Sequence, residues 1–198
     1  MSSPSLLALP ILIGIFLLSS PQPTKAQTAQ TPPAVRVQAN ILVPMRDGVH
    51  LAADLYLPNR TGPFPVLLTR TPYNKNRGSQ TARRYAEQGY AVVVMDSRGI
   101  HASQGEWEPY VNEALDGYDT QQWIGHQEWC DGNIGMYGTS YPGFTQLLPA
   151  PYRSPYVKSL LPVAAQSDNF GSIWSTNGLY HLALGLSWGP RHEAIATG

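Results

Sequence analysis

Apolar and polar residues alternate along two segments near the start of the chain. Residues 35–43 and 49–57 both follow this pattern, and the sequence Met-Arg-Asp-Gly at 45–48 lies between them. A period of two is typical of strands with one buried face, and this four-residue sequence is typical of a turn. The pattern therefore predicts an antiparallel hairpin.

The following segments change to apolar runs separated by helical patterns. A run such as Tyr-Ala-Val-Val-Val-Met at 90–95 is apolar on both faces, as in a parallel strand covered by helices on each side. Alternating strands and helices predict an α/β fold with a mostly parallel sheet, helices on both faces and the hairpin at one edge. Strands are expected at 65–70, 90–95, 133–137 and 157–164, and helices at 80–88, 112–125 and 141–150.

The N-terminal residues have the pattern of an export signal. Residues 6–18 are an apolar run too short to span a bilayer comfortably, and Thr24 and Ala26 occupy the −3 and −1 positions of a cleavage site before Gln27. The segment before the run has no Lys or Arg, which leaves an uncleaved anchor as the alternative. We expect a signal peptide at 1–26, a Pro-containing linker at 27–34 and a domain at 35–198, in a secreted or periplasmic protein without membrane attachment after cleavage.

Charge and cysteine content narrow the classes of partner and chemistry. Thirteen basic and thirteen acidic residues give a net charge of zero, so nothing indicates binding to nucleic acid or to an anionic membrane. The single cysteine, Cys130, excludes an intrachain disulfide and is interpreted as a small buried apolar residue. The sequence His192-Glu193 does not continue to a zinc motif, because residue 196 is Ala. No metal or cofactor is predicted.

The strongest chemical signal is Gly-Thr-Ser-Tyr-Pro-Gly at 138–143, between a predicted strand and a predicted helix. A nucleophile elbow needs small residues here, because its serine sits on a sharp turn close to neighbouring backbone. Ser140 would be the nucleophile, and the backbone N–H of Tyr141 would stabilise the oxyanion. The second glycine comes one residue later than in G-x-S-x-G. The alternative is an ordinary turn in which serine caps the helix.

Several further motifs accompany this hexapeptide in a fixed order. The chain resembles the X-Pro dipeptidyl-peptidase and cocaine-esterase-like hydrolases, which include the α-amino acid ester hydrolases and have the α/β-hydrolase fold. The elbow of that family is G-x-S-Y-x-G, which accounts for the late glycine. The resemblance covers about residues 35–180 and is carried by D-S-R-G at 96–99, S-Q-G-E-W at 103–107, E-A-L-D-G-Y-D at 113–119, W-I at 123–124 and W-C-D-G-N-I-G-M-Y-G-T-S-Y-P-G at 129–143.

The resemblance implies a reaction and further site residues. The acyl group of an ester, amide or short peptide would pass to Ser140 and then to water, with no cofactor. Tyr73, in R-T-P-Y-N-K at 70–75, would donate its phenol to the oxyanion hole. Asp168 would bind a substrate α-amino group, as a carboxylate near this position does in some relatives, or else it caps the following turn. A homo-oligomer is compatible with the sequence.

The order Ser…Asp…His of a catalytic triad is formally met by Ser140, Asp168 and either His181 or His192. In this fold, however, the histidine follows the final strand, and one strand is predicted after the elbow helix. We therefore expect a domain that is truncated after that strand and inactive by itself, with the acid and the base supplied by further sequence. His50, His101 and His126 are interpreted as surface or loop residues. The alternatives are an X-Pro dipeptidyl-peptidase and a non-catalytic fragment or binding module.

Overall fold

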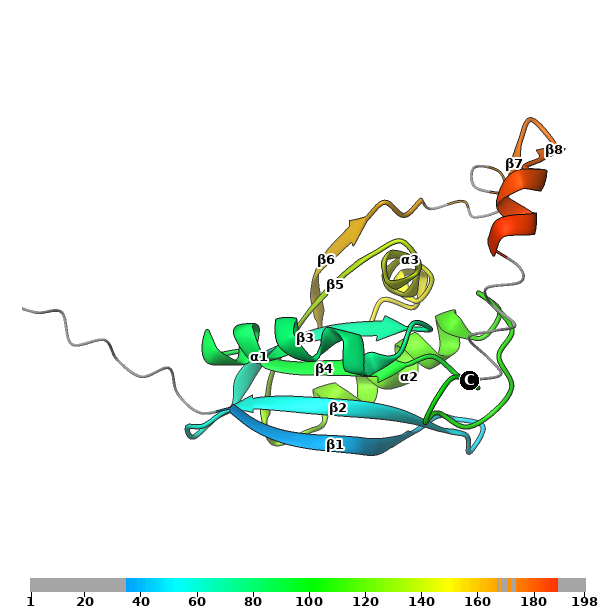
Figure 1. Ribbon diagram of the computed structural model, residues 1–198. Coiled ribbons are helices and arrows are strands. Elements are labelled where there is room, and N and C mark those ends of the chain that lie inside the picture. Colours follow the sequence, from blue (N-terminus) through cyan, green and yellow to red (C-terminus); the bar gives the residue numbers. More distant parts are fainter. Residues whose placement is uncertain (1–34, 167, 169–170, 172–173, 189–198) are drawn as a thin grey trace, which may run out of the picture. The chain divides into compact units, whose positions relative to one another are not determined.

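A computed structural model describes residues 35–166, 168, 171 and 174–188 (Figure 1). The predicted signal peptide and linker, at 1–34, lie outside the described residues, as does His192. The signal peptide and the linker therefore stay predictions.

The described part is built on a six-stranded sheet in the order β1-β2-β4-β3-β5-β6 (Figure 1). The predicted hairpin forms one end of this sheet, and its second strand also pairs antiparallel with β4. The other three pairs, β3–β4, β3–β5 and β5–β6, are parallel, so the predicted mixed architecture is confirmed. The strands are β1 (Val35–Pro44), β2 (His50–Pro58), β3 (Phe64–Thr71), β4 (Ala91–Asp96), β5 (Cys130–Thr139) and β6 (Val157–Val163).

Helices cover both faces of the sheet, as the apolar strands predicted. Successive side chains of a strand point to opposite faces. In β4, Val92 and Val94 belong to one apolar cluster with Ala82 of α1 (Ser79–Glu87). Val93 belongs to a second cluster with Ile124 of α2 (Glu113–Gly125). All six residues of β4 are therefore buried.

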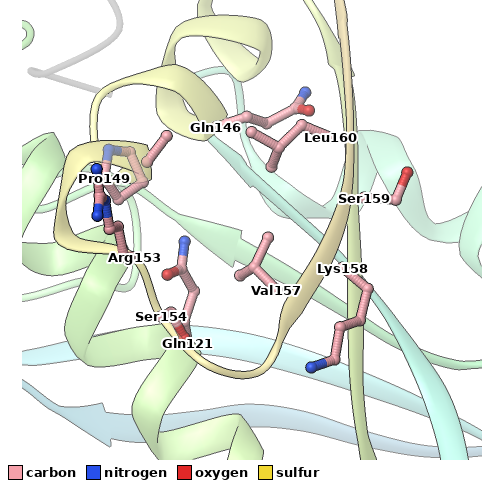
Figure 2. A pocket seen from close by; sticks show the side chains of 10 residues that line it. Gln121, Gln146, Pro149, Arg153, Ser154, Val157, Lys158, Ser159 and Leu160 are labelled. Atoms are coloured by element: carbon pink, nitrogen blue, oxygen red, sulfur yellow. The ribbon is translucent and has the colours of Figure 1, made fainter.

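The short helix α3 (Tyr141–Leu147) lies on the same face as α2. Gln121 of α2 and Gln146 of α3 line one cavity of about 210 Å³ together with residues of β6 (Figure 2). The Gln146 amide also holds the backbone of β6, because its Oε1 accepts the N–H of Leu161 at 2.9 Å and its Nε2 donates to the C=O of Leu161 at 3.2 Å. The helix that follows the elbow is thus joined to the strand beside it.

Several element boundaries differ from the sequence prediction. β5 begins at Cys130 rather than 133, because Asp131-Gly132-Asn133 is accommodated as a register shift opposite β3 instead of ending the strand. α3 ends at Leu147, because Pro149 has no N–H to continue the helix. Four short elements were not predicted: η1 (Lys75–Gly78), η2 (Ala150–Tyr152), β7 (Ser175–Thr176) and β8 (Leu179–Tyr180). Residues 182–188 are also helical.

Candidate active site

Ser140 lies in the turn between β5 and α3 with an unusual backbone conformation. Its φ is 61° and its ψ is −123°, a combination that L-residues seldom adopt. The residue is exposed and its hydroxyl makes no capping hydrogen bond to the helix, although it occupies the N-cap position. An ordinary capping serine would bond an N–H of the first turn. The geometry is that of a nucleophile elbow.

The glycines that flank Ser140 are required by close approach of the backbone. A Cβ atom on Gly138 would collide with the ring of Pro142, and the φ of Gly138 is +153°. A Cβ atom on Gly143 would lie 3.2 Å from the carbonyl oxygen of Val163 and would also contact Ala165. The late second glycine is thus explained by the end of β6, which passes beside the first turn of α3.

The same strand end fixes the backbone of Ser140. The N–H of Ser140 donates to the C=O of Val163 at 2.9 Å, and the C=O of Ser140 accepts the N–H of Gly143 at 2.7 Å. Both backbone polar groups of Ser140 are therefore held by neighbouring elements. The exposed hydroxyl is left as the group that the turn presents to solvent.

Tyr73 lies in the loop after β3, close to the first residue of α3. Its half-buried ring meets the ring of Tyr141 edge-on, with 6.3 Å between the centroids. Lys75, two residues later, fastens this loop, because its N–H donates to Asp96 at 2.7 Å and its Nζ lies 3.0 Å from Asp54 Oδ1. The structure thus brings together Ser140, Tyr141 and Tyr73, three of the four predicted site residues.

A cavity of about 340 Å³ lies beside Tyr73 and Thr139, the residue before the nucleophile. This volume is within the range of small-molecule sites. The cavity of Figure 2, by contrast, includes none of the predicted site residues. The other residues around the cavity beside Tyr73 include hydroxyl, amide and guanidinium groups; they are Thr69, Thr71, Asn74, Arg77, Gly78, Thr81, Val94, Tyr137, Gly138 and Pro142.

The Tyr141 side chain points into the interior, where several groups hold it. Its phenol oxygen accepts the N–H of Tyr110 at 3.0 Å, and its hydroxyl donates to Glu113 Oε1 at 3.1 Å. Burial, followed by the negative charge of Glu113, raises the pKa of the Tyr141 phenol far above its usual value. The hydroxyl therefore remains a donor at every physiological pH.

The sequence reasoning did not identify Arg70 and Glu113, which lie under this phenol. Arg70 has a fully buried side chain, and its Nη2 lies 2.9 Å from Glu113 Oε2. Two sequence signals could have revealed the pair: an arginine within the apolar strand at 65–70, and acidic residues three apart in the predicted helix, Glu113 and Asp116. An unpaired charge would be costly at such positions, so partners were to be expected.

Asp168 is exposed and fills a local structural role. Its Oδ1 accepts the N–H of Gly171 at 2.8 Å, as in the turn-capping alternative. Among the described histidines, the His181 ring shares a hydrogen bond with Thr176 Oγ1 at 2.9 Å, and the His126 ring contacts the C=O of Gln122 at 2.7 Å. Each of these contacts joins residues close to one another in the sequence.

Metal ligands, membrane-spanning helices and the single cysteine each bear on the class of site. Over 35–166, 168, 171 and 174–188, no group of three His, Cys, Asp or Glu side chains could hold a metal ion. Within the same ranges, no helix is long and apolar enough to cross a membrane. Cys130 is half-buried against the core, and burial raises the pKa of its thiol, which opposes a nucleophilic role.

Comparison with known proteins identifies the family of this site. Residues 47–196 match the X-Pro dipeptidyl-peptidase (S15) family. Cocaine esterase from Rhodococcus sp. (strain MB1 Bresler) is 45% identical over 159 residues, which is 77% of this chain and 28% of the esterase. The chain thus spans little more than a quarter of the length of that curated relative.

Solved structures agree with this family and with the fold. A CocE/NonD family hydrolase from Staphylococcus aureus aligns with a TM-score of 0.74 and 26% identity, over 81% of this chain and 33% of that one. An α-amino acid ester hydrolase aligns with a TM-score of 0.66 and 25% identity, over 82% of this chain and 32% of that one. The strand order and the helices on both faces are therefore those of an α/β-hydrolase.

Proposed function

The chain belongs to the X-Pro dipeptidyl-peptidase (S15) family of hydrolases, and from this premise we propose that it supplies the nucleophile of a serine hydrolase. One observation carries the proposal. Ser140 has the rarely adopted backbone angles of 61° and −123°, while its exposed hydroxyl caps nothing. Strain of this kind persists where the surrounding structure enforces it, and it is concentrated at functional sites.

The proposed reaction is acyl transfer in two steps. Ser140 Oγ attacks the carbonyl carbon of an ester or amide while a general base removes its proton. The oxyanion that forms is stabilised by the backbone N–H of Tyr141 and by the phenol of Tyr73. When the tetrahedral intermediate collapses, the alcohol or amine leaves with the proton. Water then attacks the acyl-enzyme, releasing the acid and restoring the Ser140 hydroxyl.

The base and its orienting acid are proposed to come from outside the described residues. Serine is a poor nucleophile near pH 7 unless a base is within hydrogen-bond reach. His126 and His181 make their described ring contacts with Gln122 and Thr176, and Asp168 holds a turn. The α-amino-binding role of Asp168 stays a prediction.

Small esters are the proposed substrates, and X-Pro peptides are the second candidate. The name of the family favours peptides, whereas the 45% identity to cocaine esterase favours esters. The cavity of about 340 Å³ beside Tyr73 and Thr139 is in the size range of small-molecule sites and does not distinguish the two classes. A secreted or periplasmic location is also proposed, on the pattern of residues 1–26.

The test is the Ser140→Ala variant of the protein expressed from the complete reading frame that encodes this chain. We expect hydrolysis of p-nitrophenyl esters to fall to background while the circular dichroism spectrum stays unchanged, because the catalytic groups act as a unit. Parallel assays with an Xaa-Pro p-nitroanilide distinguish the two substrate classes. Turnover by Ser140→Ala at the wild-type rate would refute the proposed nucleophile. A wild-type protein inactive on both substrates would favour a non-catalytic module.

A further inference from the structure

A buried line of polar groups joins the end of β3 to the residue after the nucleophile. Arg70 of β3 has no exposed side-chain surface, and its Nη2 lies 2.9 Å from Glu113 Oε2. Its Nη1 also donates to the backbone carbonyl oxygen of Glu113 at 3.0 Å. The other carboxylate oxygen of Glu113, Oε1, accepts the hydroxyl of Tyr141 at 3.1 Å. One carboxylate is therefore ion-paired with β3 and hydrogen-bonded to the residue after Ser140.

Stability alone is a weak explanation for this arrangement. Removing two charges from water costs free energy that their attraction recovers only in part, and apolar replacements of a buried ion pair are often as stable. Arg70 Nη2 and Glu113 Oε2 meet as an ion pair without hydrogen-bond geometry, so this carboxylate is held by the charge of Arg70 on one side and by the hydroxyl of Tyr141 on the other. The geometry fixed here is the position of Tyr141 relative to Arg70.

The two residues that Glu113 contacts, Arg70 and Tyr141, are close in the sequence to the proposed oxyanion donors or supply one of them. Arg70 precedes Tyr73 by three residues, and Tyr141 follows Ser140. The end of β3 is also tied to α3, because Thr145 Oγ1 donates to the C=O of Arg70 at 3.2 Å. Burial and the charge of Glu113 raise the pKa of the Tyr141 phenol, so the phenol remains the donor in its bond to the carboxylate at neutral pH.

We propose that Glu113 is a positioning residue for the oxyanion hole. By pairing with Arg70 and accepting the hydroxyl of Tyr141 at once, its carboxylate holds the end of β3 that leads to Tyr73 and the first residue of α3 at a fixed separation. Glu113 contacts no substrate and acts through the two proposed oxyanion donors. The inference rests on the proposed function, because it assigns a role within that same site.

The test compares two substitutions that each remove a buried carboxylate charge near Arg70. Glu113→Gln leaves one acceptor oxygen and one NH2 group in place of two oxygens, so the side chain can no longer pair with Arg70 and accept from Tyr141 at once. Asp116→Asn, one turn along α2, changes a carboxylate whose Oδ2 lies 3.9 Å from Arg70 Nη2 and whose described bonds go to Arg98. In the complete protein we expect Glu113→Gln to lower kcat for a p-nitrophenyl ester by on the order of 10-fold to 10²-fold with KM nearly unchanged. Asp116→Asn should lower the urea midpoint without lowering kcat. Equal kcat losses in the two variants would refute the positioning role.

A double-mutant cycle with Tyr73→Phe separates positioning from a general loss of structure. If Glu113 acts through the oxyanion donors, Glu113→Gln should cost less in kcat when the phenol of Tyr73 is already absent. Additive losses would overturn the proposal. If Glu113→Gln does not fold, Tyr141→Phe replaces it, because it removes the bonded hydroxyl and leaves the Arg70–Glu113 pair intact. An unchanged kcat in Tyr141→Phe would likewise overturn it.

Labelling with a fluorophosphonate distinguishes failure of this inference from failure of the proposed function. Ser140 Oγ displaces fluoride in that reaction, so the wild-type protein must be labelled at Ser140 if the serine is the nucleophile. Absence of label refutes the proposed function itself. Rapid wild-type labelling together with an equal kcat in Glu113→Gln refutes the positioning role alone.

Discussion

The backbone of Gly143 approaches Ala165 so closely that a Cβ atom added to Gly143 would lie 2.5 Å from the Cβ of Ala165. Real Cβ atoms keep a greater separation, so any larger residue at 143 forces α3 away from the end of β6. The N–H of Ser140 is bonded to Val163 in that same strand end. The first turn of α3, the end of β6 and Ser140 are therefore held at a separation that glycine allows.

Gly143→Ala should consequently destabilise the protein and lower its activity. We expect a loss of about 1–3 kcal/mol in the free energy of unfolding, as for other overpacked sites, together with a fall in kcat as the elbow shifts. Gly135→Ala in β5 is the matched control. Its added Cβ would lie 3.2 Å from the end of the flexible Leu67 side chain, which can move aside. Urea unfolding of both variants checks the prediction. A smaller loss in Gly143→Ala than in Gly135→Ala would contradict it.

The backbone strain at Ser140 can be measured with two inactive variants. Ser140→Ala keeps a Cβ atom at a φ of 61°, whereas Ser140→Gly removes it. We expect Ser140→Gly to be more stable than Ser140→Ala by about 1 kcal/mol, since the relief of left-handed strain exceeds the entropy that glycine adds to the unfolded state. At Ser159, inside β6, the order should reverse, with Ala more stable than Gly. If the Ala variant were more stable than the Gly variant at both positions, the backbone at Ser140 would be unstrained.

The phenol of Tyr73 should contribute to the rate and little to substrate binding. Tyr73→Phe keeps the ring that meets Tyr141, so we expect kcat to fall by on the order of 10²–10³ with KM nearly constant, the usual effect of losing one oxyanion donor. Tyr85→Phe serves as the control, because the Tyr85 ring packs on Tyr137 in the α1 cluster. Steady-state kinetics on a p-nitrophenyl ester measures both. A Tyr73→Phe enzyme with wild-type kcat would exclude the phenol from the oxyanion hole.

The buried pair Lys75–Asp54 should matter far more to stability than an exposed pair. Its two side chains are 5% and 6% exposed, so Lys75→Met leaves the Asp54 carboxylate buried without its cation. We expect a loss of about 3–5 kcal/mol, and a smaller loss in the double variant Lys75→Met/Asp54→Asn. Arg46→Met tests a more exposed pair, with Asp119, whose side chains are 48% and 14% exposed, and should lower the urea midpoint less than Lys75→Met does. A double variant less stable than Lys75→Met would contradict this account.

The sequence predicted the sheet well because burial on two faces leaves a clear pattern. The run at 90–95 is apolar on both faces, and in the structure every residue of β4 is buried between α1 and α2. The hairpin and the elbow were likewise identified by local patterns. Asp131-Gly132-Asn133 misled the prediction, because a register shift within a strand uses the same residues as a turn.

Two residues of the candidate site were predicted from a local motif, and Tyr73 was predicted from the resemblance to the family. Ser140 and Tyr141 are adjacent, and their motif identifies both. The bond between Glu113 and Tyr141 spans 28 residues, and its role depends on the register between α2 and α3. The role of Asp168 was left open for a related reason, because an aspartate before a turn and an aspartate that binds a ligand have the same local sequence.

The left-handed backbone at Ser140 also bears on how this family diverges. Its unfavourable free energy is present in every molecule, whether or not substrate is bound. Under the proposed function, selection for hydrolysis maintains it. In a lineage that no longer needs the reaction, glycine is the replacement that relieves the strain without reshaping the turn. Glycine at this position would therefore mark a descendant that has become a pseudoenzyme, and serine would mark one in which hydrolysis is still selected.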